Sequence, residues 1–411
     1  MITACSNSPS KLEAARTGTM QLMSQESSGQ GHLLIDASQA MLNLALGPID
    51  AMSALTGPEV CKLEVMRTLE ALGVPQAVPL DADIGVGELT AKLGVNESLL
   101  RRQLRFAFLL DMFQEPREGF VAHTNLSSAL LDFSPYIKLR LSPLFARGAH
   151  KIPEAMKLSS ADSVHIPVQL ADPRQRNMWQ MLEDDYPEGQ GMKLFSAGMR
   201  SKLSASMGPS LSPYIHGSGW ESLGPCTVVD VGGGNGHVEI SLMRQLPGIE
   251  FIVQDLSTNA EPAQALIDQY AAHDRVKFQS HDFFQPQPSL QVAPKAYLLS
   301  RVLHDWQDED CVKILRHLLP EMERHGTKLL VCERVLPEPA DEFFNYIEKQ
   351  LRTQDMLMFT LYGGGDRSLV DWTALFKRAD AGLTVEKVNR PLNSVFSFLT
   401  LGIKANEEMS H

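Results

Sequence analysis

The chain has 411 residues, of which 44% are hydrophobic and 21% are charged. This length allows two or three domains, and the composition excludes a disordered, collagen-like or disulfide-stapled protein. The 49 acidic residues outnumber the 37 basic ones, and the net charge of −12 disfavours electrostatic binding to nucleic acid or to an anionic membrane. The N-terminal segment lacks a signal-peptide pattern, no apolar run reaches the ~18 residues of a membrane span, and the five cysteines lie far apart. We therefore expect a cytoplasmic protein without a nucleic-acid or membrane partner.

Residues 1–34 are rich in Ser, Gly and Gln, which predicts a flexible leader. From residue 35 to 210, apolar residues recur at three- and four-residue spacing, the pattern of a helical domain. Within it, the segment that starts at Ile84 predicts helix, turn, helix and hairpin, with Gly94 ending the first helix and Asn96 capping the second. This order of elements is typical of a winged helix.

A winged helix raises the question of DNA binding, which Arg101, Arg102 and Arg105 on the second helix would favour. Most of the surface of that helix is nevertheless apolar, and the chain as a whole is acidic. We therefore predict a structural or dimerising role for this domain.

A segment rich in Pro and Gly follows, and from Cys226 strand-like runs alternate with helical ones. This alternation predicts an α/β domain over residues 211–411, built on a Rossmann-like, doubly wound sheet. The last two strand-like runs, residues 383–391 and 394–405, are joined by a short link and would form an antiparallel edge.

The segment DVGGGNG, residues 230–236, leads from a strand through a glycine turn into a helix. A dinucleotide-binding loop requires a third glycine at position 237, where this chain has His237. The remaining pattern, Gly232, Gly234 and Gly236 after an acid, favours S-adenosyl-L-methionine, which has no pyrophosphate to accommodate.

Acidic residues follow three successive predicted strands. Asp230 ends the first, Asp255 ends the second and would accept from a ribose diol, and Asp282 follows the third. Phe283 beside it would pack on an adenine face. The alternative is a glycine turn needed only for tight packing, with ordinary surface acids; three acids at successive strand ends favour the nucleoside site.

His304 comes just after the fourth strand, on the rim where open α/β sheets bind ligands, and would remove a proton from a substrate hydroxyl. Glu333, at the end of the fifth strand, and Asp366, on a glycine-rich turn, are candidates to orient its ring. A His–Asp pair at a strand end is by itself more often structural than catalytic, but its position relative to the glycine loop favours catalysis. No further His or Cys lies at ligand spacing from His304, so we predict no metal.

Methionine and aromatic residues at helical spacing form core by default, and they would also suit the wall of a pocket for a flat apolar substrate. The candidates for this pocket are Trp179, Phe195, Met199 and Met356.

Taken in order, the segments DVGGGNG, QDL, HDFF, LHDWQDEDCVKIL, VCERVLPEP and GGGDRSLVDW resemble the motifs of the S-adenosylmethionine-dependent small-molecule O-methyltransferases of the caffeic-acid type, in their fungal secondary-metabolite branch. The resemblance covers nearly the whole chain and implies a homodimer formed through the winged-helix domain. It implies that His304 is the general base, flanked by Glu333 and Asp366, and that a hydroxyl of an apolar phenolic or polyketide-like molecule is methylated by in-line displacement. The cofactor would be held by the residues of the glycine loop and the strand ends: Asp230, Gly232, Gly234, Gly236, Asp255, Asp282, Phe283, Ser300 and Arg301.

Two positions depart from the family pattern. Asp366 stands where Glu is usual, and Ser300 stands where Lys or Arg is frequent, with Arg301 one step along and turned to the other face of a strand. Both departures would also fit a relative that binds S-adenosylmethionine but catalyses a pericyclic reaction or a dehydration. A third alternative is a non-enzymatic regulator that uses the winged helix.

Overall fold

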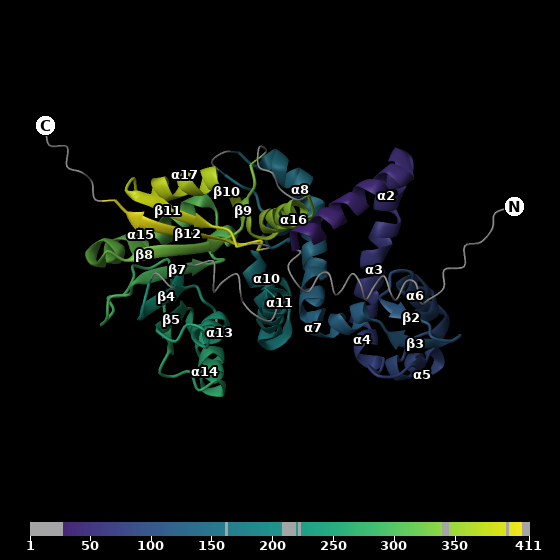
Figure 1. Cartoon of the computed structure of the whole chain (residues 1–411). Coiled ribbons are helices and arrows are strands. Elements are labelled where there is room, and N and C mark those ends of the chain that lie inside the picture. The colour runs from purple at the N-terminus through teal and green to yellow at the C-terminus, as the bar shows by residue number, and fades with distance from the viewer. Residues whose placement is uncertain are drawn as a thin grey trace.

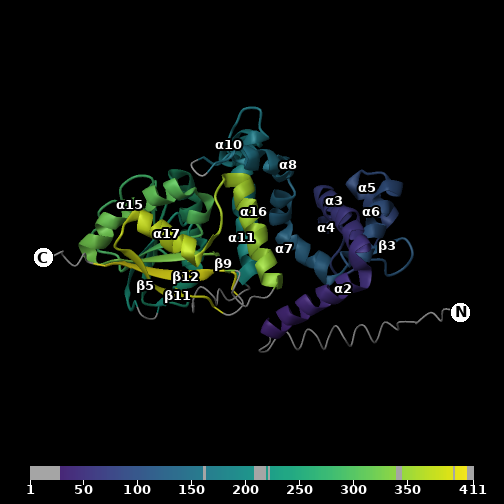
Figure 2. The same cartoon turned by 90° about the horizontal axis from the view of Figure 1, so that it is seen from above.

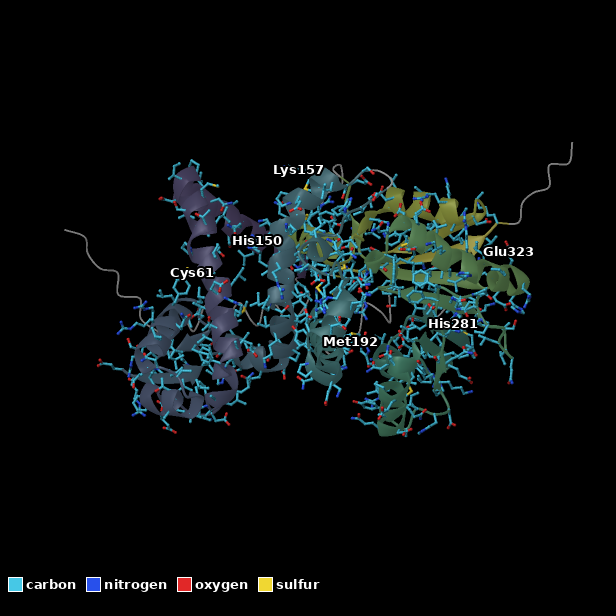
Figure 3. The ribbon with its side chains drawn as sticks, turned by 180° about the vertical axis from the view of Figure 1, so that it is seen from behind. Cys61, His150, Lys157, Met192, His281 and Glu323 are labelled. Carbon is cyan, nitrogen blue, oxygen red and sulfur yellow. The ribbon has the colours of Figure 1, made fainter. Side chains whose placement is uncertain are left out.

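The computed structural model describes residues 28–160, 163–207, 219–220, 223–338, 345–391 and 394–404. Figure 1 shows an α/β lobe around one sheet and a smaller lobe that holds the winged helix, with a layer of helices between them. In the view from behind (Figure 3), Met192 lies in this middle layer, between Cys61 on one side and His281 on the other. In the described part of the chain, no helix is both long and apolar enough to cross a membrane.

The main sheet has seven strands in the order β11-β12-β8-β7-β4-β5-β6. From β8 to β6 all neighbours are parallel, whereas β12 is antiparallel to both β8 and β11. The predicted doubly wound sheet with an antiparallel C-terminal edge is therefore confirmed. The bounds are β4 Cys226–Val231, β5 Ile249–Asp255, β6 Val276–Ser280, β7 Ala296–Ser300, β8 Lys328–Glu333, β11 Leu383–Asn389 and β12 Ser397–Ile403.

Helices cover both faces of the sheet because its strands are apolar on both sides. In β4, Val229 and Val231 pack in the core beneath α15 and α17, while Val228 packs on the opposite side with α13 and α14. By the same alternation Asp230 lies on the α13 side. These helices are α13 His237–Met243, α14 Ala260–Gln269, α15 Asp308–His325 and α17 Leu369–Ala379, and the short elements of this lobe are η3 Ser257–Asn259, η4 Leu303–Asp305, β9 Val335–Leu336 and β10 Arg367–Ser368.

The winged helix is present as the sequence indicates. Gly94 ends the first helix with a φ of 67°, and the Asn96 side chain accepts a hydrogen bond from the Leu99 amide at the start of the second. The wing is a small antiparallel sheet in the order β1-β3-β2. The elements of this lobe are α3 Pro58–Ala71, α4 Val74–Ala77, β1 Ile84–Gly85, α5 Val86–Leu93, α6 Glu97–Leu109, β2 Phe113–Gln114 and β3 Phe120–His123.

The helix α2, Ser28–Thr56, begins before residue 35, so residues 28–34 of the predicted leader are helical; residues 1–27 lie outside the described part. Tertiary contacts explain the difference. The Asp36 carboxylate accepts hydrogen bonds of 2.8 Å from the amides of Asn345 and Tyr346. This carboxylate lies at the N-terminal end of another helix, where negative charge is favourable. No local pattern in the sequence reports that contact.

The middle layer contains α7 Asn125–Arg140, α8 Pro143–Leu158, α9 Pro167–Leu170, α10 Met178–Asp184, η1 Pro187–Gly189, α11 Gln190–Met207 and α16 Asn345–Tyr362. Figure 2 shows α16 running beside α11. Leu357, Met358 and Leu361 of α16 share one buried cluster with residues of α7, α8 and α10. Part of the segment predicted as the catalytic domain therefore completes the core of the helical layer.

Candidate active site

His304 and Glu333 meet at the carboxyl edge of the sheet. His304 follows β7, and Glu333 is the last residue of β8. The two strands are parallel neighbours, and their register pairs Ser300 with Cys332. The imidazole Nδ1 lies 2.6 Å from Glu333 Oε2, and both side chains are buried. The other carboxylate oxygen, Oε1, accepts from the amides of Leu303 at 2.9 Å and His304 at 3.4 Å. Glu333 thus holds both the ring and the backbone of His304.

The charges around this histidine set its protonation. Burial by itself lowers the pKa of His304, but the carboxylates of Glu333 and Asp305 outweigh it, and the pKa is raised above its ordinary 6.5. In the same way the imidazole lowers the pKa of Glu333 against the effect of burial. An ionised carboxylate only accepts hydrogen bonds, so Nδ1 carries the proton that faces Glu333. The imidazole nitrogen left to accept a proton is Nε2.

Asp366 lies in this cluster but contacts a different partner. Its Oδ2 accepts a 2.6 Å hydrogen bond from Arg334 Nε, and both side chains are buried. The second carboxylate next to the imidazole is instead that of Asp305, with Oδ1 at 3.3 Å from His304 Nε2. Burial raises the pKa of Asp305 to about 6, partly offset by the histidine. Asp305, which the sequence analysis did not single out, is thus a further carboxylate beside the imidazole, and the flanking role of Asp366 stays a prediction.

His304, Glu333 and Asp366 offer one ligand atom each within 4.8 Å of one another, a spacing that a metal ion also requires. In this structure the His304 and Arg334 side chains already neutralise the two carboxylates. Because these contacts already supply positive charge to both carboxylates, the cluster fits an acid–base site better than a metal site.

Arg367 and Gly364 support the loop that carries His304. The Arg367 guanidinium donates to the carbonyl oxygens of Leu303 at 3.2 Å and Trp306 at 3.1 Å, and pairs with Asp308 at 2.8 Å. A Cβ added at Gly364 would lie 2.4 Å from the His304 carbonyl oxygen. The sequence motif marked this segment as a whole, but the role of Arg367 becomes visible only in three dimensions.

The glycine loop and Asp255 come together at the end of β4. The amide of Gly234 donates to Asp255 Oδ2 at 2.8 Å, and Oδ1 of the same carboxylate accepts from the Leu256 amide and the Asn259 side chain. A Cβ added at Gly234 would meet nothing within 4 Å, although φ there is 63°. The loop is therefore open to a ligand beside the Asp255 carboxylate, which is the surface that a nucleoside cofactor needs.

The other predicted ligand residues lie around this loop. The ring of Phe283 packs against Gly232, where an added Cβ would lie 3.4 Å from it, and the Asp282 carboxylate accepts from the Phe284 amide at 2.9 Å. At Gly236 the φ angle is 77° and an added Cβ would lie 3.1 Å from Val253. The observed arrangement thus fits S-adenosylmethionine at the predicted positions.

Asp230 supports this loop from below. It is 2% exposed, and a Cβ added at Gly233 would lie 2.7 Å from its Oδ2. Burial and the neighbouring Glu239 carboxyl raise the pKa of Asp230 well above its ordinary value. The ligand-binding role that the sequence analysis gave to Asp230 stays a prediction. Gly233 and Glu239 were not singled out there, although strand alternation directs Asp230 toward α13 and so toward Glu239.

Ser300 is the last residue of β7, so Arg301 lies beyond the strand and has a φ of 59°. Strand alternation therefore does not decide where the Arg301 side chain points, and the prediction that it turns to the other face of a strand does not apply. The charge of Arg301 acts on Asp230, His237 and Glu239, which places it on the glycine-loop side of the site.

Three of the four predicted pocket residues lie together. The ring of Trp179 meets Phe195 at 4.9 Å and Tyr362 at 5.5 Å between centroids, and Met199 packs on the same cluster. Burial and the nearby Asp305 charge raise the pKa of Tyr362 well above its ordinary value, so this wall reaches the His304 loop. Met356 is 49% exposed, and the buried methionine of α16 is Met358.

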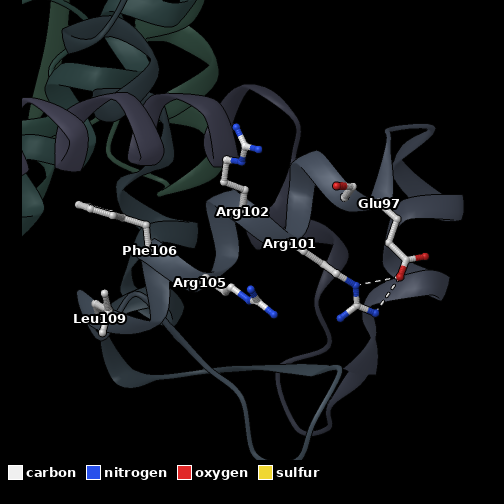
Figure 4. A pocket seen from close by; sticks show the side chains of 7 residues that line it. Glu97, Arg101, Arg102, Arg105, Phe106 and Leu109 are labelled. Atoms are coloured by element: carbon white, nitrogen blue, oxygen red, sulfur yellow. Dashed lines mark hydrogen bonds and ion pairs between the residues drawn. The ribbon is translucent and has the colours of Figure 1, made fainter.

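A separate groove of about 760 Å³ lies on α6 of the winged-helix lobe (Figure 4). It is lined by Glu97, Ser98, Arg101, Arg102, Arg105, Phe106 and Leu109. The Arg101 guanidinium is paired with Glu97 at 2.7 Å, as the dashed lines show. This groove contributes nothing to the geometry of the histidine site.

Comparisons with known proteins agree with this geometry. Residues 177–382 match the family described as the O-methyltransferase domain. The O-methyltransferase aoiO of Aspergillus oryzae is 30% identical over 381 residues, which cover 90% of each chain. The grayanic acid biosynthesis cluster O-methyltransferase of Cladonia grayi is 31% identical over 358 residues, which cover 84% of this chain and 71% of the relative. The structure of LepI in complex with SAM has a TM-score of 0.77 at 20% identity and covers 97% of this chain and 100% of that one.

The chain therefore belongs to the O-methyltransferase family, in its fungal secondary-metabolite branch. It is an O-methyltransferase, and its cofactor is S-adenosyl-L-methionine. The resemblance seen in the sequence and the fold class that it implied are both confirmed.

Proposed function

We propose that this enzyme methylates a hydroxyl of an apolar phenolic or polyketide-like molecule, and that His304 is the general base. The observation that carries the proposal is the buried 2.6 Å contact between His304 Nδ1 and Glu333, placed at the sheet edge beside the open glycine loop. The aromatic wall of Trp179, Phe195 and Tyr362 supplies the apolar surface for a ring system.

In this mechanism Glu333 fixes the proton on Nδ1, so that Nε2 accepts the proton of the acceptor hydroxyl. The raised pKa of His304 makes the imidazole a stronger base. S-adenosylmethionine, when bound, supplies an electrophilic methyl group on a sulfonium. Gly234, Asp255 and Phe283 would hold it, and the protein contributes mainly alignment and proton removal.

The test uses methyl-labelled S-adenosylmethionine with a panel of phenols and enols. Labelled product is expected from the native enzyme, and His304→Ala should lower its rate by about 10²- to 10⁴-fold. His150→Ala, an exposed histidine on α8, is the matched control. Cofactor binding with isomerisation or dehydration of the acceptor and no label transfer would favour the pericyclase or dehydratase alternative. Retarded migration of DNA in a gel, without cofactor binding, would favour the regulator.

We further propose that two copies of the chain pair through α2. This helix projects from the molecule (Figure 1) and exposes large apolar side chains along its length: Met41, Leu42, Leu44, Ile49 and Met52. Such a surface is unusual for a monomer. Light scattering should report a dimer for the native chain and a monomer for Leu44→Glu; a native monomer would refute the pairing. The cytoplasmic location stays a prediction.

A further inference from the structure

Cationic side chains from several elements gather beside the catalytic cluster. Arg140 ends α7, Lys202 lies on α11, and Arg301 and Arg334 follow β7 and β8. The charges of all three arginines act on Lys202, and Asp366 is the carboxylate that acts on it in the opposite sense. Burial and these arginines lower the pKa of Lys202 to about 7. Three arginines and one lysine from four elements therefore lie close to Asp366.

In the described part of the chain, the contacts of Arg140, Lys202 and Arg334 leave part of their charge without a carboxylate partner. Lys202 donates to the Gln354 side chain, and its Nζ lies 5.0 Å from the ring centroid of Tyr136; both partners are neutral. Among the described residues, neither Lys202 nor Arg140 forms an ion pair with a carboxylate. Arg334 uses Nε for Asp366, while its buried Nη2 has no hydrogen-bond partner in the described part of the chain. An unmatched buried cation is costly unless a ligand supplies the anion.

The position of the cluster connects it to the acceptor pocket. On α11, Phe195, Met199 and Lys202 are spaced i, i+4 and i+7 and so share one helix face. The first two belong to the aromatic wall. On α7, Tyr136 and Arg140 are likewise four residues apart. The α11 face thus presents both the apolar wall and Lys202, and Tyr136 of α7 connects Arg140 to this face through its contact with Lys202.

The cluster is also close to the reacting groups. Arg334 binds Asp366 at 2.6 Å, and Asp366 offers a ligand atom within 4.8 Å of those of His304 and Glu333. A ligand that contacts both Arg334 and the imidazole therefore needs only the dimensions of a small molecule.

We propose that Arg140, Lys202 and Arg334 form a subsite for a carboxylate carried by the acceptor, the same molecule whose hydroxyl His304 deprotonates. This inference rests on the proposed function, since it names the chemical class of the acceptor. The enzyme would then act on hydroxyaryl carboxylic acids in preference to their neutral counterparts. An anion bound there would pair with Lys202 and with the free Nη2 of Arg334.

The experiment measures binding first, so that it does not depend on turnover. Equilibrium dialysis of the enzyme, loaded with S-adenosylhomocysteine, would compare 2-hydroxybenzoate and 4-hydroxybenzoate with their amides. The acids are expected to bind the native enzyme about 10- to 100-fold more tightly than the amides, the range of a charge-assisted hydrogen bond. Lys202→Met and Arg140→Met should each remove most of this difference, whereas Lys193→Met, on an exposed position of α11, should preserve it.

Equal binding of acids and amides by the native enzyme would overturn the proposal. So would an equal loss of affinity for both ligands in Lys202→Met, which would indicate that Lys202 acts through packing. A third refuting result is a variant that binds S-adenosylmethionine more weakly but keeps the acid preference, which would assign the cations to the cofactor. Lys202→Arg keeps the positive charge and should therefore keep the acid preference that Lys202→Met loses. Label transfer to the same compounds is scored separately: acid binding without any methylation would count against the proposed function and leave the subsite standing.

Discussion

Replacing Glu333 by Gln would test the acid–base assignment most directly. The carboxylate is fully buried, accepts from the amides of Leu303 and His304 through Oε1, and lies 2.6 Å from the imidazole through Oε2. In Glu333→Gln the amide oxygen keeps the two backbone bonds, and its NH₂ group then faces Nδ1. Two donors cannot face each other, so the imidazole proton moves to Nε2 and the base is blocked.

The expected loss follows from this tautomer change. General-base catalysis contributes about 10²- to 10⁴-fold, and a comparable carboxylate-to-amide change beside a catalytic histidine costs about 10⁴-fold in a serine protease. We expect kcat to fall by about 10²- to 10⁴-fold, or roughly 3 to 5 kcal/mol of barrier. The KM for S-adenosylmethionine should stay within about threefold, because Asp255 and the glycine loop are unchanged.

The pH profile supplies a second readout with a definite sign. The base must be neutral to act, and the carboxylates of Glu333 and Asp305 raise the pKa of His304 above 6.5. For the native enzyme, kcat/KM should therefore rise with pH through a midpoint above 6.5 and then level off. In Glu333→Gln the largest charge that raises this pKa is gone, so the midpoint of the residual activity should move to lower pH.

Initial rates of label transfer across the pH range would measure both quantities. Glu323→Gln, an exposed change on α15 visible in Figure 3, is the matched control and should behave like the native enzyme. Circular dichroism and binding of S-adenosylhomocysteine would establish that the variant is folded. A folded variant that keeps the native kcat and the native pH midpoint would refute the assignment of His304 and Glu333 as a functional pair.

Three further predictions concern neighbouring residues. Asp305→Asn removes the charge 3.3 Å from His304 Nε2, so the acid limb of the kcat/KM profile should shift to lower pH, with kcat lowered only about tenfold. An unshifted acid limb would contradict the effect of Asp305 on the pKa of His304. Arg367→Met deletes the hydrogen bonds to the carbonyl oxygens of Leu303 and Trp306. We expect the free energy of unfolding in urea to fall by about 1–3 kcal/mol, and kcat to fall more than the affinity for S-adenosylhomocysteine. Gly233→Ala would place a Cβ 2.7 Å from Asp230, with an overpacking cost of about 1–3 kcal/mol and a lowered Tm. Gly234→Ala meets no atom within 4 Å, but its φ of 63° strains any other residue by about 1–3 kcal/mol, so we expect a lowered Tm together with a loss of cofactor affinity in calorimetry. Unchanged cofactor affinity in Gly234→Ala would refute the assignment of this loop to the cofactor.

Local pattern was sufficient for the fold and for the identity of the cofactor, whereas the residues that hold the cofactor stay a prediction. Alternating strand and helix periods specify a doubly wound sheet, and the glycine spacing excludes a dinucleotide loop because His237 occupies the third position. Because β4, β5 and β7 are parallel neighbours, their carboxyl ends share one edge, and the strand pattern alone predicts that Asp255 and His304 lie on the same rim.

Contacts between distant segments were decided only by the tertiary structure. The pairing of Asp366 with Arg334, the placement of Asp305 beside the imidazole and the approach of Lys202 from α11 depend on how loops and helices pack, which no spacing in the sequence encodes. Likewise Arg301 has a left-handed backbone angle just past β7, which strand alternation cannot anticipate. The physical reason is that periodicity reports which face of an element is buried, whereas the identity of the neighbour on that face depends on the whole chain.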